Sequence, residues 1–281
     1  MRWGRSNQAL PALRCLRRWT RGLSSMSGLV VKADASHTAG VGGVFVARRI
    51  ISLVPSATST LHAIGAGEQV VGRTDFDCEE WVADRPSVGG GLEPNIDLIA
   101  SLSPDLVIRF GGSDSHTATR LKAIGIRTIA VQPDHIQDIY ETISILGQAT
   151  GHPQEADSLT LSIKQGLEEV TASVADYPRL RIAYVIPGSP NWVAGPGYVT
   201  EVLGLLGGDN AFSDLHDLYS AVGREDLQTR QIDVVLLACA KDFDASLTAA
   251  RVVEIGDGLE TPGPGIIADA RRAAALMHGR L

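Results

Sequence analysis

The chain has 281 residues, of which 44% are hydrophobic and 20% charged, and its net charge is −7. These values are typical of a globular protein that is long enough for two modest cores. The acidic balance argues against nucleic acid as a partner, because phosphate binding requires a basic face. No apolar run reaches the length that is required to span a bilayer.

Residues 1–47 differ in composition from the rest, because arginines and serines cluster there and no acidic residue precedes Asp34. This composition is typical of an organellar presequence, and it lacks the long apolar core and the A-x-A site of a secretory signal. In the alternative interpretation Met26 is the true start, and a disordered arm follows it. We therefore expect an N-terminal extension over residues 1–47 that is either disordered or a targeting segment.

From residue 48 to 135, strand-like and helical stretches alternate. Pro55 ends the first apolar run, Ser56 is a candidate N-cap, and Gly65 is a candidate C-cap. The alternation predicts an α/β lobe in which helices cover both faces of a parallel sheet. The predicted strands are Ile50–Val54, Leu106–Ile108 and Thr128–Val131, and the predicted helices are Ala57–Ile64, Ile96–Leu102 and Thr117–Ile124.

Residues 136–176 contain no strand signal and are interrupted only by Gly151-His152-Pro153. Proline is favoured in the first turn of a helix, so Pro153–Ala175 is predicted to be one helix. Such a helix is about 34 Å long at 1.5 Å per residue, which is the diameter of a small domain. We expect this helical linker to span two lobes.

Residues 177–281 return to the alternating pattern and predict a second α/β lobe. The predicted strands are Arg181–Ile186, Val234–Ala238 and Val252–Ile255, and the predicted helices are Tyr198–Leu206, Glu225–Gln228, Ala245–Arg251 and Ile266–Met277. Two Rossmann-like lobes joined by a long bridging helix leave a cleft between them, which is the usual binding site of such a fold.

An ordered set of segments resembles the substrate-binding proteins of cobalamin and iron–siderophore ABC importers, and the cobalamin-binding branch most of all. The matching segments are IISLVPSATSTLHAIGAGEQVVGRTDFD, GGGLEPNIDLIASLSPDLVI, RLKAIGIRTIAV, NWVAGPGYVTEVLGLLGGDNAFSD, VGREDL and TPGPGIIADA. The resemblance implies a periplasmic binding protein with a helical backbone, which holds its ligand in a shallow cleft and performs no chemistry. It also implies a periplasmic or cell-surface location, a monomer and no cofactor apart from the ligand itself.

Aromatic side chains follow several predicted strands, where they suit a large planar ligand. An aromatic side chain buries roughly 150–250 Å² and therefore supplies much contact area. Trp192 stands out, because it lies between Pro190 and the Gly195-Pro196-Gly197 turn and is predicted to be in a loop. By the resemblance, the ligand-binding residues are Phe76, Phe110, Trp192, Tyr219 and Asp257.

The chain departs from the family at three positions, in two places, that bear on the ligand. Gly91 stands where a tryptophan often lies between the lobes, and Gly258 and Leu259 stand where bulky aromatic residues are common. These departures indicate a wider pocket, or one that is shaped for a different corrinoid or chelate.

Two acidic residues match the positions at which the family docks on a membrane permease. Asp97 and Glu225 each lie in the first turn of a predicted helix, one in each lobe. A carboxylate in that place is also favoured by the helix dipole alone. The resemblance implies that both residues contact arginines of an ABC permease.

Other chemistry has little support in the sequence. The chain lacks GxxxxGK[ST], HExxH and GxSxG motifs, so we expect no enzyme. No two of the histidines at 62, 116, 135 and 216 have ligand spacing on one element, and we expect no metal site. Arg73 and Arg109 are candidates to clamp the carboxylates of a ferric siderophore.

We therefore expect a receptor that captures a corrinoid and delivers it to a permease. The alternatives are a siderophore or haem receptor of the same family, and an intracellular or organellar corrinoid-handling protein on the same fold.

Overall fold

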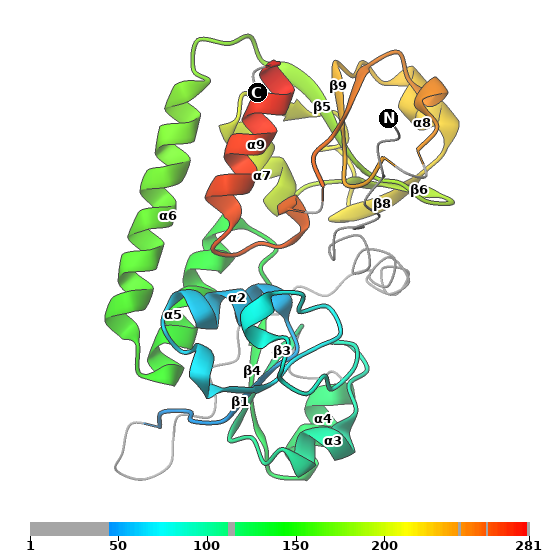
Figure 1. Cartoon of the computed structure of the whole chain (residues 1–281). Coiled ribbons are helices and arrows are strands. Elements are labelled where there is room, and N and C mark those ends of the chain that lie inside the picture. The colour runs from blue at the N-terminus through cyan, green and yellow to red at the C-terminus, as the bar shows by residue number, and fades with distance from the viewer. Residues whose placement is uncertain (1–44, 112–115, 241–242, 257, 280–281) are drawn as a thin grey trace, which may run out of the picture.

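The computed structural model describes residues 45–111, 116–240, 243–256 and 258–279. These residues form two separate sheets, one of four strands in the order β2-β1-β3-β4 and one of six strands. The two sheets belong to two α/β lobes, which lie at the bottom and the top of Figure 1. The predicted fold class is thereby confirmed. Of the predicted extension over residues 1–47, residues 1–44 lie outside the described residues.

The sheet of the N-terminal lobe is parallel throughout. It consists of β1 (Ile50–Ser52), β2 (Val70–Gly72), β3 (Leu106–Phe110) and β4 (Arg127–Val131), with the helices α2 (Pro55–Ala63), α3 (Ile96–Ser101) and α4 (His116–Ala123). Short 3-10 turns occupy Gly67–Gln69 and Glu80–Val82. All the strands and helices that were predicted here are present within two residues of their expected bounds.

The start of α2 differs from the prediction. The helix begins at Pro55, its N-cap is Val54, and no side chain caps it. Ser56 therefore lies inside the first turn, so its predicted role as N-cap is wrong. Proline supplies a helical φ and needs no hydrogen-bond acceptor for its nitrogen, which is why the helix starts at Pro55, two residues earlier than predicted. Gly65 follows the helix with φ +83°, as a helix-terminating glycine does.

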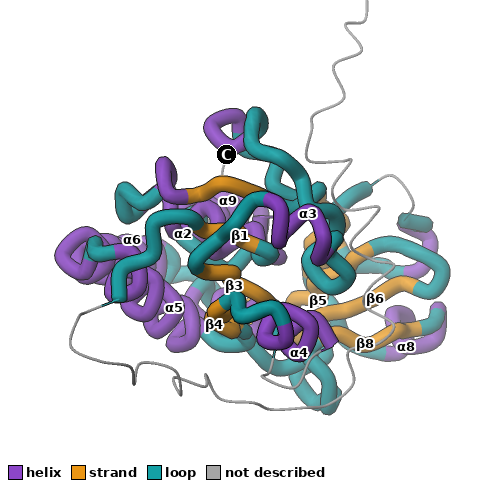
Figure 2. Tube along the Cα trace, turned by 90° about the horizontal axis from the view of Figure 1, so that it is seen from below, coloured by secondary structure: helices purple, strands orange, loops and turns teal. Residues whose placement is uncertain are grey.

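Two long helices connect the lobes. They are α5 (Ile136–Thr150) and α6 (Pro153–Ser173), and Gly151 between them has φ +81°. The helix α6 packs against α5 and also against α7 and α9 of the C-terminal lobe. It runs along one edge of both lobes, on the side opposite β6, β8 and α8 (Figures 1 and 2). The predicted bridging helix is thus confirmed.

The C-terminal sheet is mixed, in the order β10-β9-β5-β6-β8, with β7 paired to β5. Its strands are β5 (Leu180–Ile186), β6 (Asn191–Ala194), β7 (Gly208–Asn210), β8 (Tyr219–Val222), β9 (Val234–Leu237) and β10 (Arg251–Glu254). The helices are α7 (Tyr198–Leu205), α8 (Arg224–Thr229) and α9 (Ile266–His278), with 3-10 turns at Ala245–Leu247 and Gly258–Glu260. β6 is antiparallel to both β5 and β8.

Two expectations for this lobe are wrong. The helix predicted over Ala245–Arg251 is only the 3-10 turn Ala245–Leu247, and Arg251 already begins β10. Asp244 caps that turn by accepting from the Ser246 amide, which favours a turn over a longer helix. Trp192, expected in a loop, lies in the short strand β6.

Strand alternation sets which residues face the main core. In β5, Ile182, Tyr184 and Ile186 join a cluster that continues through the linker helices into the N-terminal lobe, whereas Ala183 and Val185 face a separate cluster under α8. Ala47 is part of the main cluster and donates from its backbone to the Ala149 carbonyl. Within the described part of the chain, no helix is long and apolar enough to cross a membrane.

Candidate functional site

Two of the predicted ligand-binding residues share one face of the C-terminal sheet. Trp192 in β6 pairs with Ala221 in β8, and Ala194 pairs with Tyr219. Paired residues and residues two apart lie on the same face, so the Trp192 and Tyr219 side chains are diagonal neighbours. Both are half-buried and pack on the main core cluster. The strand register thus brings these two aromatic side chains together.

The N-terminal lobe contributes its aromatic residues from different kinds of position. Phe110 is the last residue of β3 and packs on the same core cluster. Phe76 lies in the turn after β2, with its ring against Gly90. Both residues therefore lie at or just after the carboxyl end of a parallel strand, where α/β proteins place their ligands. The fifth predicted residue, Asp257, lies outside the described residues.

The carboxyl ends of the N-terminal strands meet the C-terminal lobe directly. Asp134, which follows β4, accepts a hydrogen bond of 2.6 Å through its carbonyl from the backbone N–H of Tyr198, the first residue of α7. On another side, Gly263 lies against Ser56 in the first turn of α2. These contacts join the two lobes at the carboxyl ends of the N-terminal strands.

Acidic side chains and tyrosines gather at this junction, and of this group the sequence had singled out only Tyr219. We call it the junction cluster; it consists of Asp134, Tyr184, Tyr198, Tyr219, Glu260 and Asp269. The Tyr184 hydroxyl donates to Glu260 Oε1 at 2.8 Å, and Gln132 Nε2 donates to Asp134 Oδ2 at 2.7 Å. The six residues come from six separate segments of the chain, so no local sequence motif reveals the cluster.

Electrostatics at the junction cluster favour neutral over ionised groups. Burial raises the pKa of the Asp134 carboxyl, although the hydrogen bond from Gln132 works in the opposite direction. Burial, followed by the nearby acidic groups of Glu260, Tyr198 and Asp134, raises the pKa of the Tyr219 hydroxyl. Burial, and then Asp269, also raises the pKa of Tyr198, whose hydroxyl has no hydrogen-bond partner among the described residues. Both tyrosines are therefore protonated donors at neutral pH.

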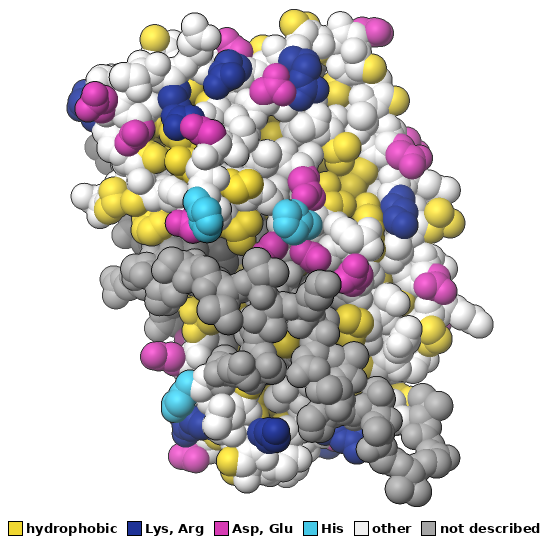
Figure 3. Space-filling view, turned by 180° about the vertical axis from the view of Figure 1, so that it is seen from behind, with side chains coloured by type: hydrophobic (Ala, Val, Ile, Leu, Met, Phe, Trp, Pro, Cys, Tyr) yellow, Lys and Arg dark blue, Asp and Glu magenta, His cyan; other side chains and the backbone are white. Residues whose placement is uncertain are grey.

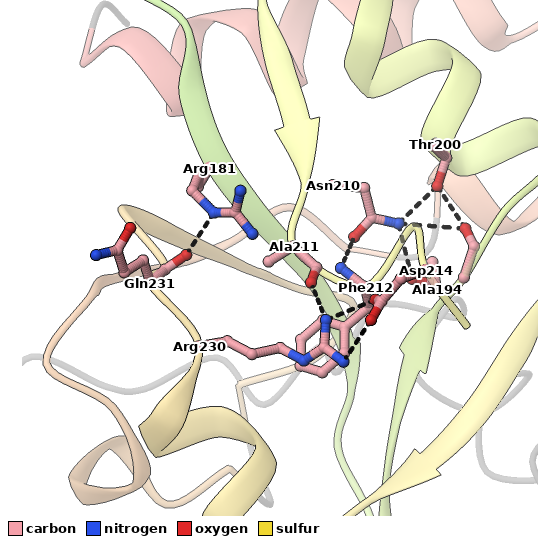
Figure 4. Close-up of polar contacts among 10 residues, drawn as sticks. Arg181, Ala194, Thr200, Asn210, Ala211, Phe212, Asp214, Arg230 and Gln231 are labelled. Atoms are coloured by element: carbon pink, nitrogen blue, oxygen red, sulfur yellow. Dashed lines mark hydrogen bonds and ion pairs between the residues drawn. The ribbon is translucent and has the colours of Figure 1, made fainter.

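A buried asparagine fixes the segment that leads from β6 into α7. Asn210, at the end of β7, donates to the Ala194 carbonyl at 2.8 Å and to Thr200 Oγ1 at 2.6 Å (Figure 4). Its Oδ1 accepts from the Phe212 backbone at 3.0 Å. The Arg230 guanidinium carbon lies 4.5 Å from the centre of the Phe212 ring, and Arg230 forms an ion pair with Asp214. The two side chains thereby cover this side of the sheet. Asn210 thereby positions both the strand of Trp192 and the start of α7.

Gly91 and Gly258, two of the positions at which the chain differs from the family, both lie against neighbouring atoms. A Cβ on Gly91 would lie 2.3 Å from the Leu53 carbonyl oxygen, so the backbone here rests on the end of β1. A Cβ on Gly258 would lie 2.1 Å from Asp269 Oδ1. No side chain fits at either position without displacement of its neighbours. At Gly258 a carboxylate of the junction cluster occupies the space beside the backbone.

The two predicted docking residues are exposed on different lobes. Asp97 lies in the first turn of α3 and Glu225 in the first turn of α8. Neither carboxylate forms a hydrogen bond or ion pair with the described residues. By contrast, the neighbouring Asp226 accepts from the Gly223 amide at 2.8 Å. Asp97 and Glu225 are thus available to a partner in a way that Asp226 is not.

The siderophore clamp and the metal site gain no support from the described residues. Arg73 donates to the Thr74 carbonyl at 2.8 Å, and the buried Arg109 donates to the Gly111 carbonyl at 3.0 Å, so both guanidinium groups are used in their own loops. Among the described residues no group of three or more His, Cys, Asp or Glu side chains is arranged to hold a metal ion. His62 stacks on Trp81, whereas His135 contacts Glu201.

The surface seen in Figure 3 carries charges of both signs. Lys and Arg side chains are scattered among Asp and Glu side chains on the part of this face that the structure describes. A nucleic-acid-binding face would instead gather its basic residues in one patch.

Two α/β lobes, a bridging helix and a junction lined by aromatic and polar side chains define a two-lobed ligand-binding protein. Residues 50–254 match the family model described as periplasmic binding protein, so the chain belongs to that family. Its members bind ligands and are not enzymes.

Relatives of known ligand are similar over most of the chain. A vitamin B12-binding protein of Yersinia pestis is 28% identical over 195 residues, which are 68% of this chain and 70% of that protein. The structure of a periplasmic vitamin B12-binding protein of Vibrio cholerae, BtuF, has a TM-score of 0.74 at 24% identity and covers 83% of this chain and 98% of that one. The haem-binding protein HutB of the same organism has a TM-score of 0.72 at 21% identity, over 82% and 98% of the two chains.

Proposed function

We propose that the protein captures a corrinoid of the cobalamin type between its lobes and delivers it to an ABC permease. The observation that carries this choice of ligand is the junction cluster, which includes Tyr219 and lies next to Trp192. Aromatic faces supply contact area for any large macrocycle, so they do not distinguish a corrinoid from haem. The acidic groups of the junction cluster, by contrast, do distinguish a corrinoid from haem.

The edge of a corrin ring carries neutral carboxamides, whereas haem carries two propionates. A carboxamide N–H can donate to Glu260 or Asp134, and its carbonyl can accept from the protonated Tyr219 hydroxyl. A propionate would bring a further negative charge to a half-buried site whose carboxyl pKa is already raised by burial. Like charges in such a place cost free energy, and no Lys or Arg of the described residues is among the groups that shift the pKa of Asp134 or Tyr219.

The similarity to the vitamin B12-binding protein of Yersinia pestis supports the same ligand class. The family is one of periplasmic proteins, and we propose a periplasmic or cell-surface location for this chain as well. Ligand-binding roles for Phe76, Phe110, Trp192, Tyr219 and Asp257 are part of the proposal.

The test of the ligand is calorimetry with cyanocobalamin and with haem on the full chain. We expect saturable binding of cyanocobalamin and weaker binding of haem. Trp192→Ala should reduce cyanocobalamin affinity about 30-fold, because truncation of a central aromatic anchor costs roughly 2 kcal/mol or more. Tighter binding of haem would replace the corrinoid proposal with a haem receptor.

Trp81→Ala is the matched control. Trp81 packs on the same core cluster, but it stacks on His62 near the far end of α2 and not at the junction. We expect this variant to lose some stability and to keep its affinity. Equal losses of affinity in both variants would remove the pocket assignment of Trp192.

Delivery to a permease is tested by reversing charge at Asp97 and Glu225 together. We expect uptake of the corrinoid to be lost in cells while affinity for it stays unchanged, because both side chains are exposed and have no hydrogen-bond or ion-pair partner among the described residues. The control is the double variant Glu155→Lys and Asp157→Lys on α6, at the edge opposite α8 (Figures 1 and 2). Normal transport by the Asp97/Glu225 variant would contradict docking through these residues.

A further inference from the structure

The turn that carries Phe76 is closed by a buried carboxylate. Asp77 is only 6% exposed, and its Oδ2 accepts from the Thr74 backbone N–H at 2.6 Å and from Thr74 Oγ1 at 2.7 Å. Thr74 Oγ1 in turn accepts from the Phe76 backbone N–H at 3.1 Å. The backbone on both sides of the Phe76 ring is thus fixed through one carboxylate and one hydroxyl.

Asp77 also connects this turn to the helix that follows β1. The Thr58 side chain, which is buried in the first half of α2, interacts with the Asp77 carboxyl and lowers its pKa, while its hydroxyl also contacts the Val54 carbonyl at 3.3 Å. Arg73 donates to the Thr74 carbonyl from the other side of the turn at 2.8 Å. The turn is therefore anchored to α2 and does not rest on its own local hydrogen bonds alone.

A second segment supports the turn from outside. The Asp75 amide donates to the Gly89 carbonyl at 3.0 Å, and Ser87 Oγ donates to Asp75 Oδ1 at 2.7 Å. The ring of Phe76 lies 3.9 Å from the position that a Cβ on Gly90 would take. The ring is thereby placed between the turn and the segment 87–91.

We propose that Asp77 is a positioning residue for ligand binding: its buried carboxylate holds the Thr74–Asp77 turn against α2 and so presents the Phe76 ring to the ligand. This inference rests on the proposed function, because it gives the turn a role only if Phe76 contacts the ligand. Asp77 itself does not touch the ligand in this proposal.

The ionised state of Asp77 is costly, which fits a role in positioning more than one in stability. Burial raises the pKa of the Asp77 carboxyl, and the hydrogen bonds from Thr58 and Thr74 only partly offset that rise. Since the folded pKa lies above the unfolded value, the folded state loses stability as pH rises from the unfolded pKa through the folded one. Ionisation of the Asp77 carboxyl in the folded protein thus costs stability.

The test is a double-mutant cycle on cyanocobalamin affinity, measured by calorimetry with the full chain. Phe76→Ala alone should weaken binding about tenfold, and Asp77→Ala alone should weaken it by a similar factor, since loss of the anchor displaces the ring. In the Phe76→Ala background, Asp77→Ala should cause no further loss. Asp77→Asn keeps an acceptor for the Thr74 amide and hydroxyl and should restore most of the affinity.

The control is Asp105→Ala, which removes another carboxylate that accepts two backbone N–H groups. Asp105 binds the amides of Arg48 and Arg49 at the amino-terminal edge of the sheet, away from the junction. It should lower stability without changing affinity. If Asp77→Ala does not fold, Thr74→Val replaces it in the affinity measurement, because it removes the hydroxyl that binds Asp77 but keeps the shape of the side chain.

The outcomes separate this inference from the proposed function. Absence of cyanocobalamin binding, or normal affinity of Phe76→Ala, overturns the assignment of Phe76 and with it the proposed site. A tenfold loss in Phe76→Ala with an independent, additive loss in Asp77→Ala overturns only the positioning role. Unchanged affinity in both Asp77→Ala and Thr74→Val also overturns only the positioning role.

Discussion

The two lobes share one architecture but present their aromatic residues by different means. In the N-terminal lobe every strand pair is parallel; Phe110 is the last residue of β3, and Phe76 lies in the turn after β2. In the C-terminal lobe an antiparallel ribbon, β6 with β8, lies at the edge of the sheet and carries Trp192 and Tyr219. A residue after a strand depends on its turn for its position, whereas a residue in a ribbon depends on strand register. We therefore expect local substitutions to have different effects on the two lobes.

The largest effect that we expect comes from Asn210→Ala. The variant leaves the buried carbonyl of Ala194 without its donor and the Phe212 amide without its acceptor. We expect the free energy of unfolding to fall by about 3 kcal/mol, from roughly 1–3 kcal/mol for each unsatisfied buried group. Urea unfolding measures the loss.

Hydrogen exchange on the same variant sharpens the comparison. Protection should fall in β6 and at the start of α7 and should stay unchanged in β1 and β3. An equal loss of protection in both lobes would show that the ribbon is not an independent element of the C-terminal lobe.

A second, smaller effect tests how closely the two linker helices α5 and α6 pack against each other. A Cβ on Gly147 in α5 would lie 2.4 Å from Ala156 Cβ in α6, so Gly147→Ala should force the helices apart. We expect a net loss of about 1–2 kcal/mol, since overpacking costs roughly 1–3 kcal/mol and alanine returns up to about 1 kcal/mol of helix propensity.

Gly204→Ala in α7 is the matched substitution, because no atom lies within 4 Å of the added Cβ. It should stabilise the protein by up to about 1 kcal/mol through helix propensity alone. Urea unfolding of the two variants should thus give opposite signs. The same sign in both would contradict the close approach of α5 and α6.

The smallest effect concerns an ion pair that joins the lobes. His135 Nδ1 lies 2.6 Å from Glu201 Oε1 of α7, and the Glu201 hydrogen bond raises the pKa of His135 above its usual value of 6.5, although partial burial works against this. Asp134 and Asp138 are the other charged groups that act on the imidazole, and both favour its charged form. The pair is largely exposed, so its contribution is a few tenths of a kcal/mol.

The sign of the pH dependence follows from the raised pKa. The stabilisation is complete below the unfolded pKa and disappears as pH rises through the folded pKa. The difference in unfolding free energy between the native chain and His135→Gln should be larger at pH 5.5 than at pH 8.5. A difference that grows with pH would rule out this link as the source.

Most of the N-terminal lobe was predictable from sequence, and the reason is physical. Runs such as Ile50–Ser52 and Leu106–Phe110 are buried on both faces, so they appear as continuous apolar segments between helix signals. The strands β6 and β8 lie near the edge, have four residues each and mix polar with apolar residues, so no period of two is visible in them. For this reason Trp192 was expected in a loop.

The candidate site was predictable only in part. Phe110, Trp192 and Tyr219 pack on one core cluster, and resemblance had singled them out, yet their ligand contacts stay a prediction. The junction cluster was missed because Asp134, Tyr184 and Glu260 are far apart in the chain and meet only when the lobes assemble. The T-x-x-D pattern of Thr74 and Asp77 was a local signal for a capped turn, and attention to it would have identified the anchor of Phe76.

The most direct test of the account is hydrogen exchange of the full chain with and without saturating cyanocobalamin. The account predicts protection in both lobes at once, in residues 73–77, 191–194, 219–222 and 258–260, and none along the outer face of α6. Protection confined to one lobe, or located on α6, would contradict a ligand held between the lobes.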